Sequence, residues 1–391
     1  MLTELGLTLE TPQAPDQADV HDPPEAVKKG HTLETPEAAG QGRSLGPPVA
    51  SDWAFQDRVL PGVSRTFALT IPELPEGIRP VVANGYLLCR IADTIEDEPA
   101  LALEQKQAFH REFSQVVAGD GDAASFARRL APLLSQRTSD AERELVQGTK
   151  SVVRICRSFA DRPRAALVRC VRIMCAGMPQ FQSKAKGRPG LENMDEMHAY
   201  CYIVAGVVGE MLTELFCSYA PDVDARRDEL SSRAVAFGYG LQMTNILKDI
   251  WDDWPQGFCW LPRDVFARHG FDLADMDRRP LPQGFKDGLG ELLAVGHGHL
   301  CSALDYTLLI PPAQVGMRRF CLRALMMAAL TLRRINQRRG FLAGDEVKIS
   351  RRTVRTVVAT TDLLASRDAA LKLLFRLSAR GLPLPPAGRP A

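Results

Sequence analysis

Two groups of acidic residues repeat one spacing in distant parts of this 391-residue chain. Each group has carboxylates at positions i, i+3 and i+4, and the groups are Asp93/Glu96/Asp97 and Asp249/Asp252/Asp253. On an α-helix these positions share one face, where like charges repel unless a cation lies between them. A single group of this kind is usually a solvated helix face. Because the spacing occurs twice, we interpret the pair as a site for Mg²⁺, or Mn²⁺, that links carboxylates to the phosphates of a substrate.

Each acidic group continues a polar stripe along an otherwise apolar stretch. The first stripe is Tyr86/Arg90/Asp93/Asp97, and the second is Gln242/Asn245/Asp249/Asp253. A buried polar group without a partner costs roughly 1–3 kcal/mol. Two such stripes would satisfy each other across a cavity through metal, water and phosphate. Arg90 and Lys248 lie beside the acids, where they can counter the charge of a diphosphate.

Helical periodicity dominates the rest of the chain, and no β-hairpin pattern is present. The periodicity predicts an all-α, single-domain bundle. The predicted helices span 80–95, 197–219, 234–251, 318–338 and 363–377, and Pro262 marks the first turn of another. The first and third of these helices carry the acidic groups, so they are expected to face the same cavity.

Composition and charge argue against several classes of function. The formal net charge of +1 gives no overall reason to bind nucleic acid. Nine cysteines without a CxxC pair suit reduced thiols in a cytosol, and seven histidines without such partners leave little basis for a zinc enzyme. No segment reaches about 18 uninterrupted apolar residues, and the N-terminus lacks a signal-peptide pattern. We expect a cytoplasmic protein without a transmembrane segment, with contact at a membrane surface left open.

The two ends of the chain differ from the middle. Residues 1–50 contain seven prolines and no Phe, Trp or Tyr, and the sequence Thr-Leu-Glu-Thr-Pro occurs twice, from Thr8 and from Thr32. So little apolar material predicts a disordered, low-complexity tail, in which the repeat is either a tolerated sequence or a docking motif. Residues 381–391 contain four prolines and are predicted to be flexible. The helical domain is therefore expected at 51–380.

Four motifs, in the same order, resemble those of the squalene/phytoene synthase family. They are Ser64-Arg65-Thr66-Phe67, the segment from Tyr86 to Asp97, the segment from Tyr200 to Gly209, and the segment from Gln242 to Asp253. The resemblance covers roughly residues 55–355. It is closest to squalene synthases, because of Asp93-Thr-Ile-Glu96-Asp97 and the downstream run from Val347 to Arg351. It implies an isoprenoid-synthase bundle around a central apolar cavity, and a role in isoprenoid, sterol or hopanoid biosynthesis.

The resemblance also implies a reaction and the residues that perform it. The reaction is the Mg²⁺-dependent, head-to-head joining of two farnesyl diphosphates through presqualene diphosphate, followed by reduction with NADPH to squalene. The implied metal ligands are Asp93, Glu96, Asp97, Asn245, Asp249 and Asp253. The implied substrate contacts are Ser64, Arg65, Phe67, Tyr86, Arg90, Gln242, Asn245, Lys248, Lys348 and Arg351. Tyr200 is the implied proton carrier, on a segment where Gly206 and Gly209 let another helix or a substrate chain approach closely.

Several alternatives remain open at this point. A phytoene or dehydrosqualene synthase shares the first half of the reaction and omits the reduction, and another enzyme of this kind would stop at presqualene diphosphate. A non-catalytic helical assembly protein would keep the bundle, although the intact acids argue against it. No Gly-rich dinucleotide fingerprint follows a strand, so NADPH would bind outside a Rossmann fold. The choice between C15 and C20 substrates and the oligomeric state are not predicted.

Overall fold

The computed structural model describes residues 46–64 and 66–386. Most of the predicted N-terminal tail, the last five residues and Arg65 lie outside this part, so the predictions made for them stay predictions. These described residues belong to one compact unit. No strand occurs among the described residues of this unit, and an isolated bridge pairs Leu191 with Pro262. The all-α prediction is confirmed.

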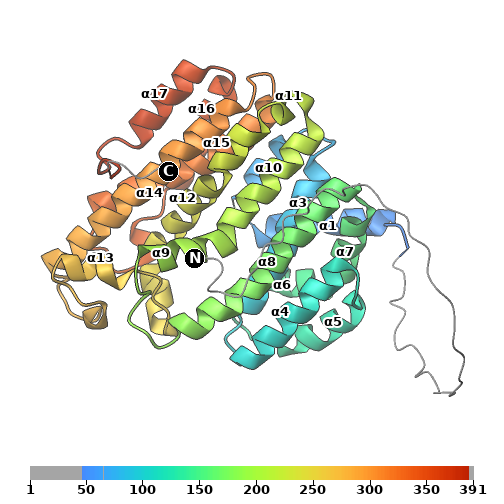
Figure 1. Ribbon diagram of the computed structural model, residues 1–391, viewed down its shortest axis with the longest axis horizontal. Helices are drawn as coiled ribbons and strands as arrows, with labels where there is room; N and C mark the ends of the chain where they lie inside the picture. The colour runs from blue at the N-terminus through green and yellow to red at the C-terminus, as the bar shows by residue number, and fades with distance from the viewer. Residues whose placement is uncertain (1–45, 65, 387–391) are drawn as a thin grey trace, which may run out of the picture. The chain divides into compact units, whose positions relative to one another are not determined.

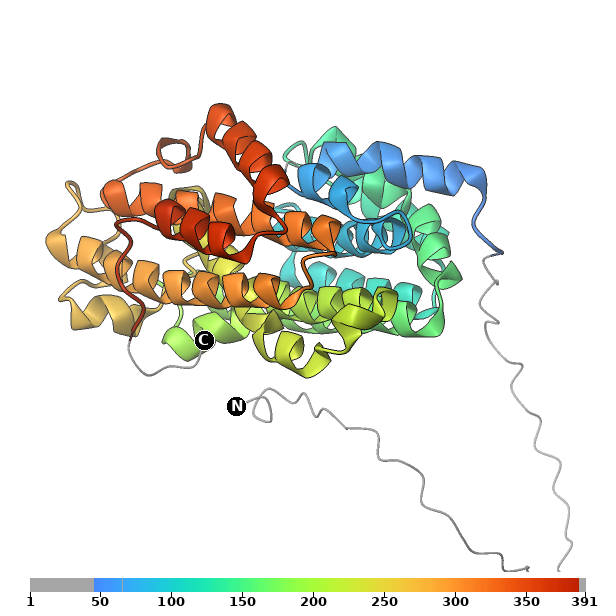
Figure 2. The same cartoon turned by 90° about the horizontal axis from the view of Figure 1, so that it is seen from above.

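The helices follow one another with short connections. The first half contains α1 (Ala50–Val63), α2 (Phe67–Thr70), η2 (Ile71–Glu73), α3 (Arg79–Asp97), α4 (Leu103–Ala118), α5 (Ala123–Leu130), η3 (Ala131–Leu133), α6 (Asp140–Gln147), α7 (Thr149–Ser158) and α8 (Asp161–Ala185). The second half contains α9 (Met194–Cys201), η4 (Tyr202–Gly206), α10 (Val207–Tyr219), α11 (Pro221–Asp224), α12 (Arg227–Asp253), η5 (Trp254–Gln256), α13 (Arg263–Arg268), η6 (Leu273–Asp275), α14 (Gln283–Leu309), α15 (Val315–Gln337), η7 (Gly344–Glu346), α16 (Arg351–Leu364) and α17 (Asp368–Ser378). In Figures 1 and 2 the early helices α1–α7 gather on one side of this unit and α13–α17 on the other.

The two helices that carry the acidic groups form as predicted. The predicted helix at 80–95 is α3, whose first turn accepts Pro80 because the missing amide hydrogen would have no partner there. Its apolar side, including Leu88 and Ile91, is completely buried. The predicted helix at 234–251 is part of α12, which begins earlier and continues to Asp253. Both acidic groups therefore lie at the C-terminal ends of long helices.

α12 is a central helix of the bundle, in contact with α10, α14 and α15. Glycines allow this close packing. A Cβ atom at Gly209 would lie 2.2 Å from the carbonyl oxygen of Ala234, and one at Gly238 would lie 2.3 Å from that of Ala205. Since no side chain fits in such gaps, the backbones of α12 and the η4–α10 segment touch directly. The small residues predicted in this segment serve helix packing.

The segment from Met194 to Tyr219 is one continuous helical run with a π-helical turn, η4, in its middle. By length and composition alone it could cross a membrane, although half of its most apolar window is buried inside the unit. Its acid Glu210 forms an ion pair with Arg169 at 2.7 Å, and Glu214 pairs with Arg227. The run packs between α8 and α12, as a core helix does.

The predicted helix at 363–377 is correct only from Asp368 onward, where it is α17. α16 ends at Leu364, and α17 begins only at Asp368. Arg318 of α15, which is completely buried, donates hydrogen bonds to the carbonyl oxygen of Ala365 at 3.1 Å and to the Asp368 carboxylate at 2.6 Å. A buried guanidinium needs such acceptors, and the break between α16 and α17 supplies them.

Candidate active site

A large cavity opens between the two acidic helices. Its first region has a volume of about 620 Å³ and mostly apolar walls from α3, α10, α12 and α15. Its second region has a volume of about 780 Å³ and is lined mainly by polar and charged side chains. Six residues line both regions: Arg90, Asp93, Val204, Gln242, Asn245 and Lys248. The regions are therefore two ends of one cavity, each within the size range of small-molecule sites, about 300–1,000 Å³.

Carboxylates from both helices meet at the polar region. Those that line it are Asp93, Glu96 and Asp97 of α3 and Asp249 and Asp253 of α12. Burial, reinforced by the neighbouring acids, raises the pKa of Asp253 to about 7. Burial also raises the pKa of Asp93 to about 7, with Arg90 opposing the shift and Asp97 adding to it. Crowded acids of this kind are destabilised in their charged form until a cation joins them.

The chemistry of these side chains fits a hard divalent cation. One carboxylate oxygen of Glu96 is buried without a hydrogen-bond partner among the described residues. No three His, Cys, Asp or Glu side chains in that part of the chain stand close enough together to hold a metal ion on their own. Mg²⁺ commonly takes one or two carboxylates and completes its shell with water and phosphate. A cation at this site would complete its shell with water or with oxygens of a bound ligand.

The third acid of the α12 group lies outside the cavity. Asp252 is exposed and does not line the polar region. It faces the η7 turn instead, where a Cβ atom on Gly344 would come within 3.0 Å of its carboxylate. On a helix, Asp249 and Asp253 are one turn apart, and Asp252 lies beside them toward the surface. The two acidic groups thus share a spacing but not the same arrangement.

Two cations stand where the polar and apolar regions meet. Arg90 lies 3.7 Å from Asp93 and forms a second ion pair with Glu142 of α6. Lys248 lies 3.1 Å from Asp249. The nearby acids outweigh burial and raise the pKa of Arg90. Glu142 is not among the residues predicted from the sequence, because the Ser139-x-x-Glu142 pattern identifies the start of a helix and not the partner of that helix.

Tyr200 lies against the polar region in an aromatic stack. The Tyr200 ring is parallel to the Trp260 ring, with the two centroids 4.0 Å apart. The centroid of the Phe181 ring lies 5.5 Å from that of Tyr200. The side chain is buried and lines the region. Burial, with a contribution from Glu96, raises the pKa of Tyr200 well above its usual value. The phenol therefore remains protonated and is held rigidly beside the acids.

Residues 64–67, the first predicted motif, have two different roles. Ser64 is structural, and Phe67 lines the cavity. The Ser64 hydroxyl accepts a hydrogen bond from the Phe67 amide at 2.8 Å and does not line either region. Phe67 and Tyr86 line the apolar region with ring centroids 5.0 Å apart, and the Tyr86 hydroxyl donates to the carbonyl oxygen of Val63 at 2.9 Å. Ser64 thus begins the α2 turn that presents Phe67, while Arg65 lies outside the described residues.

The remaining predicted residues are not all brought together. Gln242 and Asn245 line both regions, and Lys348 lines the apolar one. Arg351 is exposed in the first turn of α16 and lines neither region. Lys348 lies in the loop before α16, whereas Arg351 begins that helix and is exposed to solvent.

Three further side chains at the polar end were not predicted. They are Arg137, Lys106 and Gln182. Gln182 donates to the carbonyl oxygen of Glu96 at 2.6 Å, and Lys106 donates to the same oxygen, so both secure the end of α3. The basic loop from Ser183 to Arg188 is interpreted from the sequence either as a cover for the diphosphates or as a solvated loop, and its Lys186 lines the polar region. Lys106 and Gln182 stand on ordinary amphipathic helices, and no sequence pattern indicates their position.

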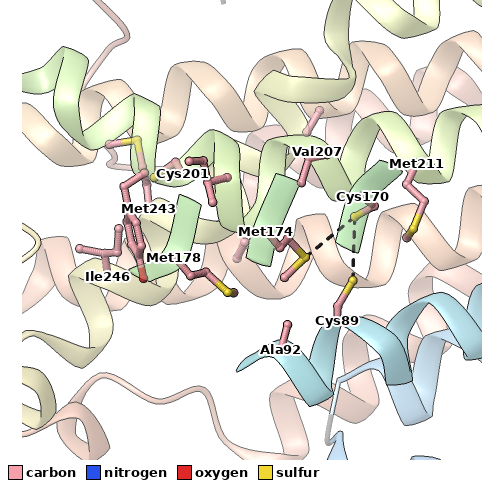
Figure 3. Close-up of a cluster of buried hydrophobic side chains, with 14 of the residues drawn as sticks. Cys89, Ala92, Cys170, Met174, Met178, Cys201, Val207, Met211, Met243 and Ile246 are labelled. Atoms are coloured by element: carbon pink, nitrogen blue, oxygen red, sulfur yellow. Dashed lines mark hydrogen bonds between the residues drawn. The ribbon is translucent and has the colours of Figure 1, made fainter. Parts of the chain in front are cut away.

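Sulfur-containing side chains of α3 and α8 pack together at the wall of the apolar region. Figure 3 shows Cys89 and Cys170 pointing toward each other, with their sulfurs 4.0 Å apart, and Met174 next to them at 3.9 Å from Cys170. Cys89 and Met174 line the apolar region. All nine cysteines are free, and eight are buried. Their burial agrees with thiols packed as small hydrophobic groups, while their reduced state stays a prediction.

Known proteins of related sequence and structure share this arrangement of helices. A family model of squalene/phytoene synthases matches residues 60–353. The squalene synthase of Schizosaccharomyces pombe is 26% identical over 278 residues, which cover 70% of this chain and 58% of that protein. Squalene synthase 1 of Arabidopsis thaliana is 27% identical over 294 residues, with coverage of 73% and 65%. The chain thus spans somewhat more than half the length of these relatives.

Solved structures support the same fold. The structure of TcSQS with the ligand BPH1237 has a TM-score of 0.67 at 23% identity and covers 85% of this chain and 98% of that one. A dehydrosqualene synthase in complex with a ligand has a TM-score of 0.56 at 18% identity, with coverage of 80% and 96%. Identities this low establish shared architecture and nothing finer. Because the family model matches most of the chain and the acidic helices face one cavity, the chain belongs to the squalene/phytoene synthase family.

Proposed function

We propose that this chain joins two farnesyl diphosphates head to head, through presqualene diphosphate, and reduces the product with NADPH to squalene. One observation carries the proposal: an acidic region that demands cations continues directly into a large apolar region. A prenyl diphosphate has the same division into a charged head and an apolar chain. Relatives named squalene synthases support this substrate and product over other members of the family.

The charged head would bind at the polar region. The residues that would hold Mg²⁺, or Mn²⁺, are Asp93, Glu96, Asp97, Asn245, Asp249 and Asp253. The bound ion would neutralise the diphosphate and stabilise the charge that develops as it leaves. Arg90 and Lys248 would donate hydrogen bonds to phosphate oxygens at the boundary between the regions. They would thereby orient the chain of the substrate toward the apolar end.

The apolar region would protect the cation that remains after the diphosphate departs. An allylic cation is captured by water unless its surroundings are dry. Phe67, Leu212 and Phe320 are among the side chains that line this region and offer no nucleophile. They would hold the second prenyl chain against the cation so that a carbon–carbon bond forms.

Tyr200 would move the proton that the first coupling step releases. A neutral phenol relays a proton by accepting it on oxygen while it donates its own to a neighbouring base. The neighbouring bases here are the diphosphate oxygens and the acids of the polar region. The stack on Trp260 keeps the hydroxyl in one position during this exchange.

Analysis of the products tests the proposal. The purified chain is incubated with farnesyl diphosphate and Mg²⁺, with and without NADPH, and the extracted products are identified. Squalene that forms only with NADPH is the expected result. Dehydrosqualene regardless of NADPH would assign the chain to the non-reducing branch. A C40 product from geranylgeranyl diphosphate, without any C30 product, would contradict the proposal.

A further inference from the structure

We propose that the outer face of α16 and α17 docks onto an anionic phospholipid surface. This face, called the α16–α17 face below, consists of Leu363, Lys372, Leu373, Arg376, Leu377 and Arg380. Lys372, Leu373, Arg376 and Leu377 share the exposed side of α17 at helical spacing, and Arg380 follows in the turn after the helix. Leu371 and Phe375, on the opposite side of α17, are buried.

Leucines on this face are unusually exposed. Leu363 is 70% exposed, Leu373 is 52% exposed and Leu377 is 53% exposed. Nearby Leu384, just after α17, is 84% exposed. Four of the nine large apolar residues that are exposed in the described part of the chain therefore fall between residues 363 and 384. Single exposed leucines are ordinary, whereas a cluster on adjacent segments indicates a contact surface.

Positive charge accompanies the leucines. From Arg351 to Arg380 the sequence has seven basic and two acidic residues, in a chain whose net charge is only +1. Both acids are already paired with arginines of α15, although each stays partly exposed: Asp362 lies 2.7 Å from Arg323, and Asp368 lies 2.6 Å from Arg318. Lys372, Arg376 and Arg380 form no ion pair with any residue that the structure describes, so their charges remain available to an external anion.

Exposed leucines next to exposed basic side chains favour one kind of partner, an anionic lipid surface. A helix with leucines on one face, flanked by cations, lies at the boundary between lipid headgroups and acyl chains, and anionic lipids strengthen the contact. α17 lies at the outside of the unit, packed on α14 and α15. α15 in turn contributes Phe320 and Met327 to the apolar region of the cavity. Only α17 and α15 would lie between a bilayer docked here and that region. If the proposed function holds, this position would help apolar substrates and products to pass between the bilayer and the cavity.

Vesicle flotation tests this docking without any assay of activity. The full chain is mixed with phosphatidylcholine vesicles, either pure or containing about one quarter phosphatidylglycerol, and the floated fraction is measured at low and high salt. We expect flotation with the anionic vesicles, weakened by salt. A charge variant (Lys372→Gln, Arg376→Gln, Arg380→Gln) should lower partitioning about a hundredfold. A leucine variant (Leu373→Gln, Leu377→Gln) should lower it on its own.

A matched control uses exposed residues of the same types elsewhere. The double variant Arg128→Gln, Leu133→Gln on α5 and η3 should float like the wild type. Thermal unfolding identifies any variant that fails to fold, in which case the other variant decides. Equal binding to both vesicle types, no binding, or unchanged binding of the charge variant and the leucine variant would overturn the proposal. A solution dimer that these variants dissociate would assign the face to a second copy and also overturn it.

Discussion

Glu142, in the first turn of α6, forms an ion pair with Arg90 of α3, 52 positions earlier in the chain. The other oxygen of Glu142 accepts a hydrogen bond from the Ser139 amide at 3.0 Å, so the carboxylate is held from both sides. Arg90 in turn stands 3.7 Å from Asp93. A residue outside the cavity thus sets the position of a cation between its two regions.

Replacing Glu142 with Gln should impair catalysis without unfolding the protein. Glutamine can keep the cap on α6, but it cannot form the ion pair that orients Arg90. We expect kcat/KM to fall about tenfold, mainly through KM for the diphosphate substrate. Glu144→Gln is the matched control. Glu144 lies on the same helix as Glu142, and it forms an exposed ion pair with Arg58 of α1 at 2.7 Å. Equal effects of the two substitutions would refute the positioning role.

The acidic group on α12 provides a second test. Asp249→Asn should lower kcat at least about a hundredfold, because it removes a ligand of the proposed cation. Asp252→Asn should stay within about threefold of wild type, since Asp252 lies outside the cavity. Steady-state rates at saturating Mg²⁺ measure both. Similar losses in the two variants would mean that the spacing, and not the cavity, identifies the functional acids.

Acidic crowding should make stability depend on pH. The pKa of Asp253 is about 7 in the folded chain and near 3.8 when unperturbed, so the folded state holds more protons between those values. Stability from this group is therefore highest at low pH and is lost as the pH rises to about 7. Asp253→Asn should raise the Tm by a few degrees at pH 8 without Mg²⁺, and by less at pH 5.

The same variant should lose part of the stabilisation by Mg²⁺. A cation binds the deprotonated acids, so Mg²⁺ should raise the Tm of the wild type more at pH 8 than at pH 5. Thermal unfolding at both pH values, with and without Mg²⁺, measures these differences. A Tm difference between variant and wild type that is the same at both pH values would contradict the assignment.

Tyr200→Phe should separate chemistry from packing. The phenyl ring can keep the stack on Trp260, while the hydroxyl beside the acids is lost. We expect kcat to fall about a hundredfold with little change in Tm. Tyr202→Phe is the control, because the Tyr202 hydroxyl bonds Glu210 at 3.2 Å and lines neither region of the cavity. An active Tyr200→Phe enzyme would remove the phenol from the reaction.

The close contact between α12 and the η4–α10 segment should leave no room for a side chain at Gly238. A Cβ atom there would lie 2.3 Å from the carbonyl oxygen of Ala205, so Gly238→Ala should destabilise the fold by about 1–3 kcal/mol. Gly296→Ala in α14 is the control. A Cβ atom there would lie 3.4 Å from its nearest neighbour, so this substitution should be neutral or stabilising, by up to about 1 kcal/mol. Denaturant unfolding compares the two. Equal stability of both variants would contradict the close packing.

Local sequence patterns determined the helical class and much of the site. The period of apolar residues predicted α3 and α15 closely, and the spacing of the acids placed Asp93 and Asp97 on one face. Those inferences succeed because backbone hydrogen bonding and side-chain direction repeat every few residues. The break before α17 escaped the same reasoning, since it depends on the acceptors that buried Arg318 requires.

Only the tertiary structure decided which of the predicted residues meet. It separated Asp252 from Asp249 and Asp253, because a helix on the edge of a cavity turns adjacent side chains toward different surroundings. It also paired Glu142 with Arg90 through the packing of α6 against α3, a contact between distant segments that no local pattern encodes.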